Sequence, residues 1–224
     1  MNAADIKERR VAWALLLICP LSLVMLCIYI ATLDDGSRLF ELHPRIYLQV
    51  TCILWAAVMA ILPILRLRRK LALPMWFLAI LYADMYIFVT SLYNGMYMEL
   101  HWWANFTHVV SSLVVASIVF MALCVMDARS PSHVTFGSRG GMVVMTILLA
   151  CAFGVIWEVG EGFVEIITQY DYMSYGAVHT LLNLAADLIG AFIMGAIAWF
   201  MLGRHDTEYF ASKVRIGAKN IDVG

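Results

Sequence analysis

The chain has 224 residues, of which 63% are hydrophobic and 14% are charged, and its formal net charge is −1. This composition lies far outside the usual range of soluble globular proteins, and it excludes a soluble enzyme or a nucleic-acid-binding module. Long apolar runs predict an integral membrane protein. Because backbone polar groups in lipid must bond within the segment that carries them, we expect the spans to be helices.

Six apolar segments are long enough to cross about 30 Å of hydrocarbon as helices. In chain order they cover residues 11–32, 46–65, 71–93, 103–126, 141–163 and 176–202. The sequence therefore predicts an all-α membrane protein with six transmembrane helices.

Lysine and arginine are sorted between the two sides of this arrangement. Thirteen of the 15 lie in residues 1–10, 66–70, 127–140 and 203–224, and the other two are Arg38 and Arg45. Cytoplasmic loops carry the excess of positive charge. The pattern predicts a multi-pass protein of the cell membrane with both termini in the cytoplasm.

The ionisable residues predict how the chain is organised. The first two spans carry no acidic, basic or histidine residue, whereas the last four carry several. We therefore expect a two-span apolar hairpin over residues 1–70, a four-span core over 71–202 and a cytoplasmic tail over 203–224.

Six ionisable side chains fall in the half of the last four spans that the charge pattern places outside: Asp84, His108, Glu158, Glu161, His179 and Asp187. A charge in hydrocarbon is costly, so this gathering indicates a site. Glu158 and Glu161 share one helix face, and His179, Asn183 and Asp187 share another, because residues three or four apart are neighbours on a helix. We expect a polar cavity that opens to the extracytoplasmic side and is closed below by apolar residues.

Three interpretations of these residues remain open. In the first, His108, Glu158 and His179 bind a divalent metal such as zinc, iron or manganese. In the second, His108, Glu158 and Glu161 are catalytic acid–base groups. The substrate-binding residues would then be Asp84, Asn183 and Asp187. In the third, the same groups form a buried hydrogen-bonded network that holds the helices together or passes protons.

Short motifs over roughly residues 75–200 resemble those of the VanZ-like membrane proteins, and more closely those of the YjdF-type family. The matching segments are Trp157-Glu158-Val159-Gly160-Glu161, the span start that ends at His108, and Gly190-Ala191. Aspartates of the family pattern are replaced here by Ala104, His179 and Asn183. The resemblance implies an uncharacterised polytopic inner-membrane protein and defines no reaction.

The sequence predicts an integral membrane protein whose outer-facing site acts on a lipid or envelope precursor. Two other functions remain open: a transporter or proton-coupled carrier, and a structural subunit of a membrane complex. Membrane lipids are the expected partners, and no feature predicts binding to nucleic acid. Whether the protein is an enzyme is left open by the residues.

Overall fold

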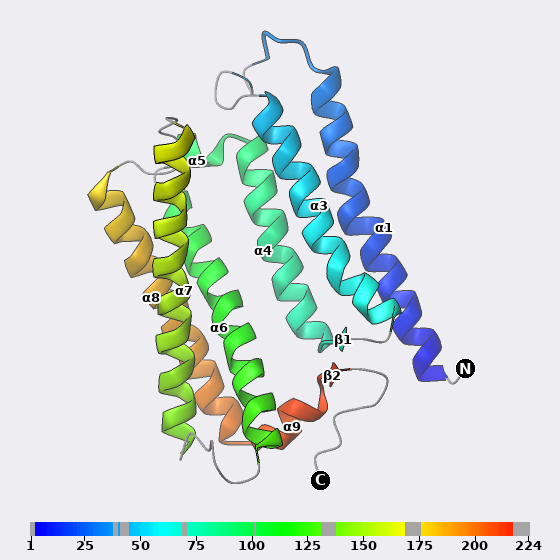
Figure 1. Ribbon diagram of the computed structural model, residues 1–224, viewed down its shortest axis with the longest axis vertical. Helices are drawn as coiled ribbons and strands as arrows, with labels where there is room; N and C mark the ends of the chain where they lie inside the picture. Colours follow the sequence, from blue (N-terminus) through cyan, green and yellow to red (C-terminus); the bar gives the residue numbers. More distant parts are fainter. Residues whose placement is uncertain are drawn as a thin grey trace. The chain divides into compact units, whose positions relative to one another are not determined.

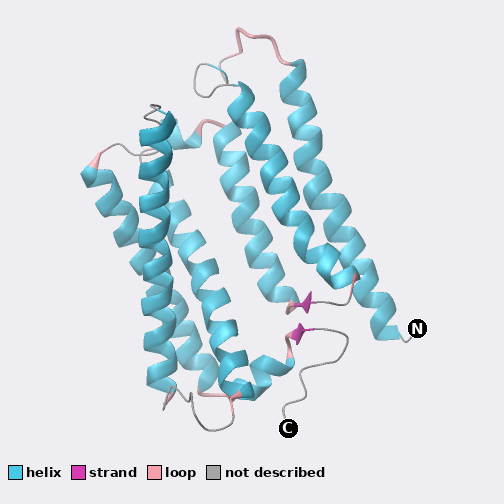
Figure 2. Ribbon diagram, viewed as in Figure 1, coloured by secondary structure: helices cyan, strands magenta, loops and turns pink. Residues whose placement is uncertain are grey.

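A computed structural model of the protein describes residues 3–37, 40, 45–68, 71–100, 102–130, 138–168 and 176–216 (Figure 1). Nearly all of these residues are helical (Figure 2). The helices are α1 (Ala3–Thr32), α3 (Arg45–Leu67), α4 (Met75–Tyr93), α5 (Met96–Glu99), α6 (Trp103–Arg129), α7 (Arg139–Thr168), α8 (Ala177–Leu202) and α9 (Thr207–Ser212). Two short strands, β1 (Leu71–Ala72) and β2 (Arg215–Ile216), pair antiparallel.

Five of the described helices are long and apolar enough to cross a membrane: α1, α3, α6, α7 and α8. Their bounds agree closely with the predicted spans, which confirms the all-helical membrane fold class. The apolar part of α4, Phe77–Tyr93, is shorter. Its predicted start at residue 71 is wrong, because Pro74 precedes the first turn and residues 71–72 pair with β2. Proline has no backbone N–H and favours an extended residue before it, so it sets a helix start.

The residues that the structure describes form two compact units. The first comprises the described residues of 3–100 and 213–216, and the second comprises those of 102–212. Helix α4 therefore belongs with α1 and α3. The predicted division into a hairpin (1–70), a functional core (71–202) and a tail (203–224) describes functional parts rather than compact units, and it stays a prediction.

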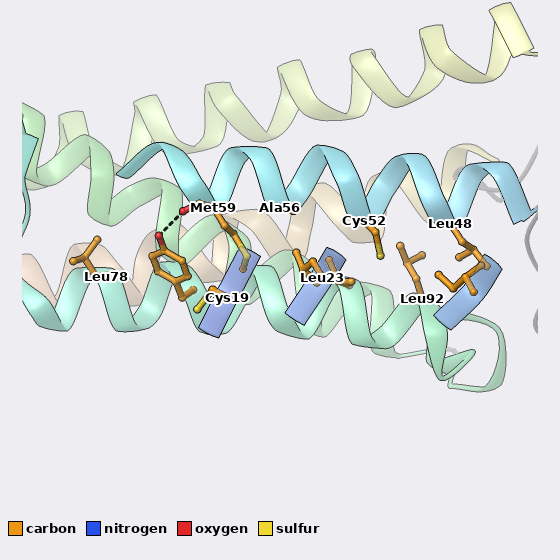
Figure 3. Packing of buried hydrophobic residues seen from close by; sticks show 11 residues of the cluster. Cys19, Leu23, Leu48, Cys52, Ala56, Met59, Leu78 and Leu92 are labelled. Carbon is orange, nitrogen blue, oxygen red and sulfur yellow. Dashed lines mark hydrogen bonds between the residues drawn. The ribbon is translucent and has the colours of Figure 1, made fainter. Parts of the chain in front are cut away.

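The first unit is built around an apolar core between α1, α3 and α4 (Figure 3). Leu23, Leu48 and Met59 are almost fully buried in it. The hydroxyl of Tyr82 on α4 donates to the carbonyl oxygen of Met59 on α3 at 2.6 Å. A buried tyrosine is thereby satisfied by a backbone acceptor on the neighbouring helix, as a phenol in an apolar core requires.

The second unit is a bundle of α6, α7 and α8, with α7 antiparallel to the other two (Figure 1). Glycine allows two of these helices to approach closely. A Cβ on Gly190 would collide with the carbonyl oxygen of Val109 and would lie 2.9 Å from Ser112 Cβ. Small residues at helix interfaces are the usual device for close packing in membranes, where lipid removes most of the hydrophobic drive for association.

The short helix α9 packs against α6 in the second unit. The rings of Phe120 and Phe210 meet edge to face with centroids 5.3 Å apart. The Thr207 hydroxyl donates to Asp127 Oδ2 at 2.6 Å. Part of the predicted tail is therefore folded onto the bundle.

Candidate functional site

The polar residues of the second unit lie toward one end of its bundle. The starts of α6 and α8 and the end of α7 share this end (Figure 1). At 1.5 Å rise per residue, His108 lies about 8 Å from the start of α6. By the same rise, Glu158 and Asp187 lie about 15 Å from the end of α7 and the start of α8. All three residues therefore lie in the half of the bundle nearest this end.

His108 lies between carboxylates from two other helices. Its Nδ1 is 3.2 Å from Asp187 Oδ1 on α8, and its Nε2 is 3.7 Å from Glu158 Oε1 on α7. The three side chains are 15%, 8% and 5% exposed for His108, Asp187 and Glu158 respectively. The pair with Asp187 is within hydrogen-bonding distance, whereas the separation from Glu158 is too long for a direct hydrogen bond.

Glu161 completes a group of three. One side-chain donor atom each from His108, Glu158 and Glu161 can be chosen so that all lie within 4.8 Å of one another. Glu161 is held by its own helix, because Trp157, one turn earlier, donates its indole N–H to Glu161 Oε1 at 2.8 Å. Half of the Trp157 surface is exposed, so this hydrogen bond lies at the surface of the bundle.

Asp187 is placed by two further features. The hydroxyl of Ser112 on α6 donates to the Asp187 backbone carbonyl at 2.6 Å, which ties α6 to α8 at this level. On α7, Gly154 leaves the space that the carboxylate occupies, since a Cβ there would lie 2.5 Å from Asp187 Oδ2. An alanine at this position of α7 would therefore displace the Asp187 carboxylate.

Two carboxylate oxygens of the site are buried without a hydrogen-bond donor among the described residues. They are Glu158 Oε1 and Asp187 Oδ2. Most buried polar groups in proteins are paired, and an exception inside a membrane bundle calls for an explanation. Both exceptions belong to side chains that face His108.

A second polar chain lies beside this group. Asn105 on α6 donates to Asn183 Oδ1 at 3.4 Å, and Asn183 Nδ2 lies 3.3 Å from His179 Nδ1. Because an amide nitrogen only donates, His179 Nδ1 accepts in this contact. Asn183 is almost fully buried. Its two contacts link α6 to the first turns of α8.

The structure brings together the three residues predicted to be catalytic, His108, Glu158 and Glu161. Asp187, predicted to bind substrate, contacts His108 directly. The predicted metal set was His108, Glu158 and His179. His108 and Glu158 lie in the group of three, whose third member is Glu161. His179 contacts Asn183, and its role in metal binding stays a prediction.

One predicted site residue lies outside this bundle, and two contacts of the site were not predicted from the sequence. Asp84 lies on α4 in the first unit, so its predicted role beside the site stays a prediction. The spacing of four between Trp157 and Glu161 was available as a signal for their hydrogen bond. The pairing of Gly154 with Asp187 depends on helix packing and has no local signature.

Comparison with known proteins identifies the chain at the level of a family. No curated protein and no solved structure matches it. Residues 12–204 match the profile of a family described as predicted membrane protein (DUF2238), and this match includes all the site residues. The chain therefore belongs to this family of predicted membrane proteins.

Proposed function

We propose that this protein is a multi-pass membrane enzyme that carries out acid–base chemistry on a lipid or an envelope precursor. The observation that carries the proposal is His108, mostly enclosed in the bundle between Asp187 and Glu158. A carboxylate at Nδ1 holds an imidazole in one orientation and one tautomer, and leaves Nε2 to exchange protons. Asp187 has this position, and Nε2 is directed toward Glu158.

The surroundings of the site support an amphipathic substrate. The helices that carry it have apolar outer surfaces, including exposed Ile156, Val159 and Phe163 on α7. A molecule with an acyl chain can lie along such a surface while its polar group enters the site. Glu161 and His108 are only partly buried, and Trp157, which donates to Glu161, is half exposed, so we expect the polar part of such a molecule to enter past Trp157.

The proposed topology has six spans, with α4 as the third. Its apolar part, Phe77–Tyr93, rises about 26 Å as a helix, which is near the lower limit for crossing a bilayer. The charge distribution then puts both termini in the cytoplasm and the site in the outer half of the cell membrane. The resemblance to VanZ-like and YjdF-type proteins adds to this proposal, because its Trp-Glu-x-x-Glu motif supplies Glu158 and Glu161.

Contacts beyond Asp187 favour a one-sided site over a carrier. One turn below Asp187, Gly190 packs against the backbone of α6. Further along, the Ser117 hydroxyl donates to Met194 Sδ at 3.2 Å, and both residues are buried. A carrier needs polar access from both faces of the membrane, and these contacts close α6 against α8.

The proposal is tested by replacing one acid–base group and reading lipid chemistry. Cells lacking the protein are complemented with wild type, Glu158→Gln or Glu208→Gln, and extracted lipids and envelope precursors are compared by mass spectrometry. Glu208, exposed on α9, provides the matched control. We expect Glu158→Gln to reproduce the pools of cells without the protein, and Glu208→Gln to restore wild-type pools.

Glutamine keeps the shape of Glu158 but does not accept a proton at neutral pH, so a loss at equal protein level reports on chemistry. Wild-type pools with Glu158→Gln would contradict the proposal. A reduced level of folded protein, with pools that scale with that level, would assign Glu158 a structural role and also contradict it.

A further inference from the structure

We infer that His108, Glu158 and Glu161 form a binding site for one divalent transition-metal ion, with Asp187 positioning the histidine. This inference deepens the proposed function. Metal binding itself does not depend on that function, but the catalytic role of the ion rests on it. The geometry of the ligand atoms, the charge of the group and its unpaired oxygens each lead to it.

The donor atoms have the right identity and nearly the right spacing. An imidazole nitrogen and two carboxylates suit zinc, iron or manganese, whereas a copper(I) site needs sulfur ligands. Metal–ligand distances of about 2.0–2.2 Å imply about 3.3–3.6 Å between neighbouring ligand atoms in a tetrahedral site. His108 Nε2 and Glu158 Oε1 are 3.7 Å apart, and the three donor atoms lie within 4.8 Å of one another.

The second nitrogen of the histidine is already held as metal sites require. A metal-bound imidazole usually donates its other N–H to a carboxylate or carbonyl, which sets the tautomer and the ring orientation. Asp187 Oδ1 lies 3.2 Å from His108 Nδ1, on the side opposite to Glu158. Gly154 on α7 provides the space for this carboxylate.

Charge gives the second argument. The group brings the carboxylates of Glu158, Glu161 and Asp187 around one histidine, which carries at most one positive charge. Helices α6, α7 and α8 contain no lysine or arginine except Arg129 and Arg139 at their ends. In a medium of low dielectric constant, excess negative charge is strongly unfavourable, and a divalent cation offsets two charges.

The unpaired oxygen gives the third argument. The Glu158 side chain is 5% exposed, and its Oε1 has no hydrogen-bond donor among the described residues. This same atom is the one nearest His108 Nε2. A carboxylate oxygen buried beside an imidazole nitrogen, with neither bonded to the other, is positioned to share an ion.

Three protein ligands leave at least one coordination position for water or a substrate oxygen, as in catalytic metal sites. Such an ion would supply Lewis-acid polarisation of a bound oxygen. Glu161, like His108, is only partly buried, and it accepts a hydrogen bond from half-exposed Trp157.

The test measures metal directly on full-length protein in detergent, after removal of any histidine tag. Metal content is determined by plasma mass spectrometry. Zinc and manganese are then titrated separately into chelator-treated protein by calorimetry. We expect about one ion per wild-type chain. His108→Ala and Glu161→Gln should lose this ion, whereas the controls His205→Ala and Glu208→Gln, both at exposed positions, should retain it.

Three further variants distinguish ligands from neighbours. His179→Ala should retain the ion, which separates this ligand set from one that uses His179. Asp187→Asn should weaken affinity by about 10–100-fold without changing the stoichiometry. Gly154→Ala should weaken it similarly by displacing Asp187. Gly160→Ala, on the same helix with nothing within 4 Å of the new Cβ, should bind like wild type.

Each outcome decides the inference. Equal metal binding by wild type and His108→Ala, or by wild type and Glu161→Gln, would overturn it, provided that size-exclusion profiles agree. If His108→Ala fails to fold, the metal content of Glu161→Gln and the difference in affinity between Gly154→Ala and Gly160→Ala still decide whether the site exists. The lipid-pool experiment reads a different quantity. A failed metal site with altered pools for Glu158→Gln leaves the proposed function standing, and a confirmed site with unaltered pools removes only that function.

Discussion

At the scale of single residues, small side chains make room for the buried carboxylate of Asp187 and for the close approach of two helices. The carboxylate of Asp187 has space because residue 154 is glycine, and α8 approaches α6 because residue 190 is glycine. Ser112 lies at the same contact and donates to the Asp187 carbonyl. In a membrane, where packing and hydrogen bonds hold helices together, such positions have strong effects on stability.

Gly190→Ala tests this close approach. The new Cβ would collide with the Val109 carbonyl oxygen, which belongs to a helix backbone and does not move aside cheaply. We expect the free energy of unfolding to fall by about 1–3 kcal/mol, as for other overpacked interiors. Thermal unfolding in detergent measures it.

Gly162→Ala on α7 is the control for this prediction. Its Cβ would meet nothing within 4 Å, and the gain in helix propensity is the same in both variants. Similar melting temperatures for the two variants would show that the contact at Gly190 is not tight.

At the scale of elements, Arg45 connects the end of α1 to the start of α3. Arg45, the first residue of α3, donates to the carbonyl oxygens of Ala31 and Leu33 at 3.1 and 2.6 Å. These carbonyls lie at the end of α1, where the last turn of a helix has no partners of its own. The guanidinium also lies over the Phe40 ring, 4.4 Å from its centroid. Arg45 thereby joins the two helices of the first hairpin.

Arg45→Ala should lower the free energy of unfolding by about 1 kcal/mol, because the lost bonds are charge-assisted but the side chain is partly exposed. Its ion pair with Asp35 adds little, since the Asp35 side chain is 99% exposed. Arg45→Lys should recover less than half of the loss, because an ammonium group lacks the planar fork that reaches two carbonyls.

Thermal unfolding and amide hydrogen exchange at the end of α1 check this prediction. Arg68→Ala, at an exposed position after α3, serves as the control. Protection at the end of α1 that is unchanged in Arg45→Ala would contradict the capping role.

At the scale of the whole molecule, the open question is whether α4 crosses the membrane. Its apolar part is shorter than the other five, yet the distribution of lysine and arginine predicts an even number of spans. If α4 crosses, the residues after it lie on the same side as the loop after α1. If it does not cross, the loop between α6 and α7 becomes external.

Single cysteines at Ser37, Asn94 and Ser138, in a background without the five native cysteines, separate these topologies. We expect a membrane-impermeant maleimide to label Ser37→Cys and Asn94→Cys in intact cells, and Ser138→Cys only after permeabilisation. Labelling of Ser138→Cys in intact cells, with Asn94→Cys protected, would replace the six-span topology with one of five spans.

Sequence alone determined where the long helices lie, because apolar runs of this length have few other ways to satisfy their backbone in lipid. It also singled out His108, Glu158, Glu161 and Asp187 as candidate site residues, since charges in apolar spans stand out and helical spacing assigns them to faces. The start of α4 was misplaced by four residues, although Pro74 was a visible signal.

Only the tertiary structure decided which of these faces meet. Spacing along one helix gives a direction but no partner, and the partner depends on helix rotation and approach, which contacts such as those of Gly154 and Gly190 determine. His108 consequently contacts Asp187 and Glu158, Glu161 lies close to both His108 and Glu158, and Asp84 lies with α1 and α3 in the other unit. Helix pairing is a non-local property, because it is set by the fit of complete surfaces rather than by any one residue.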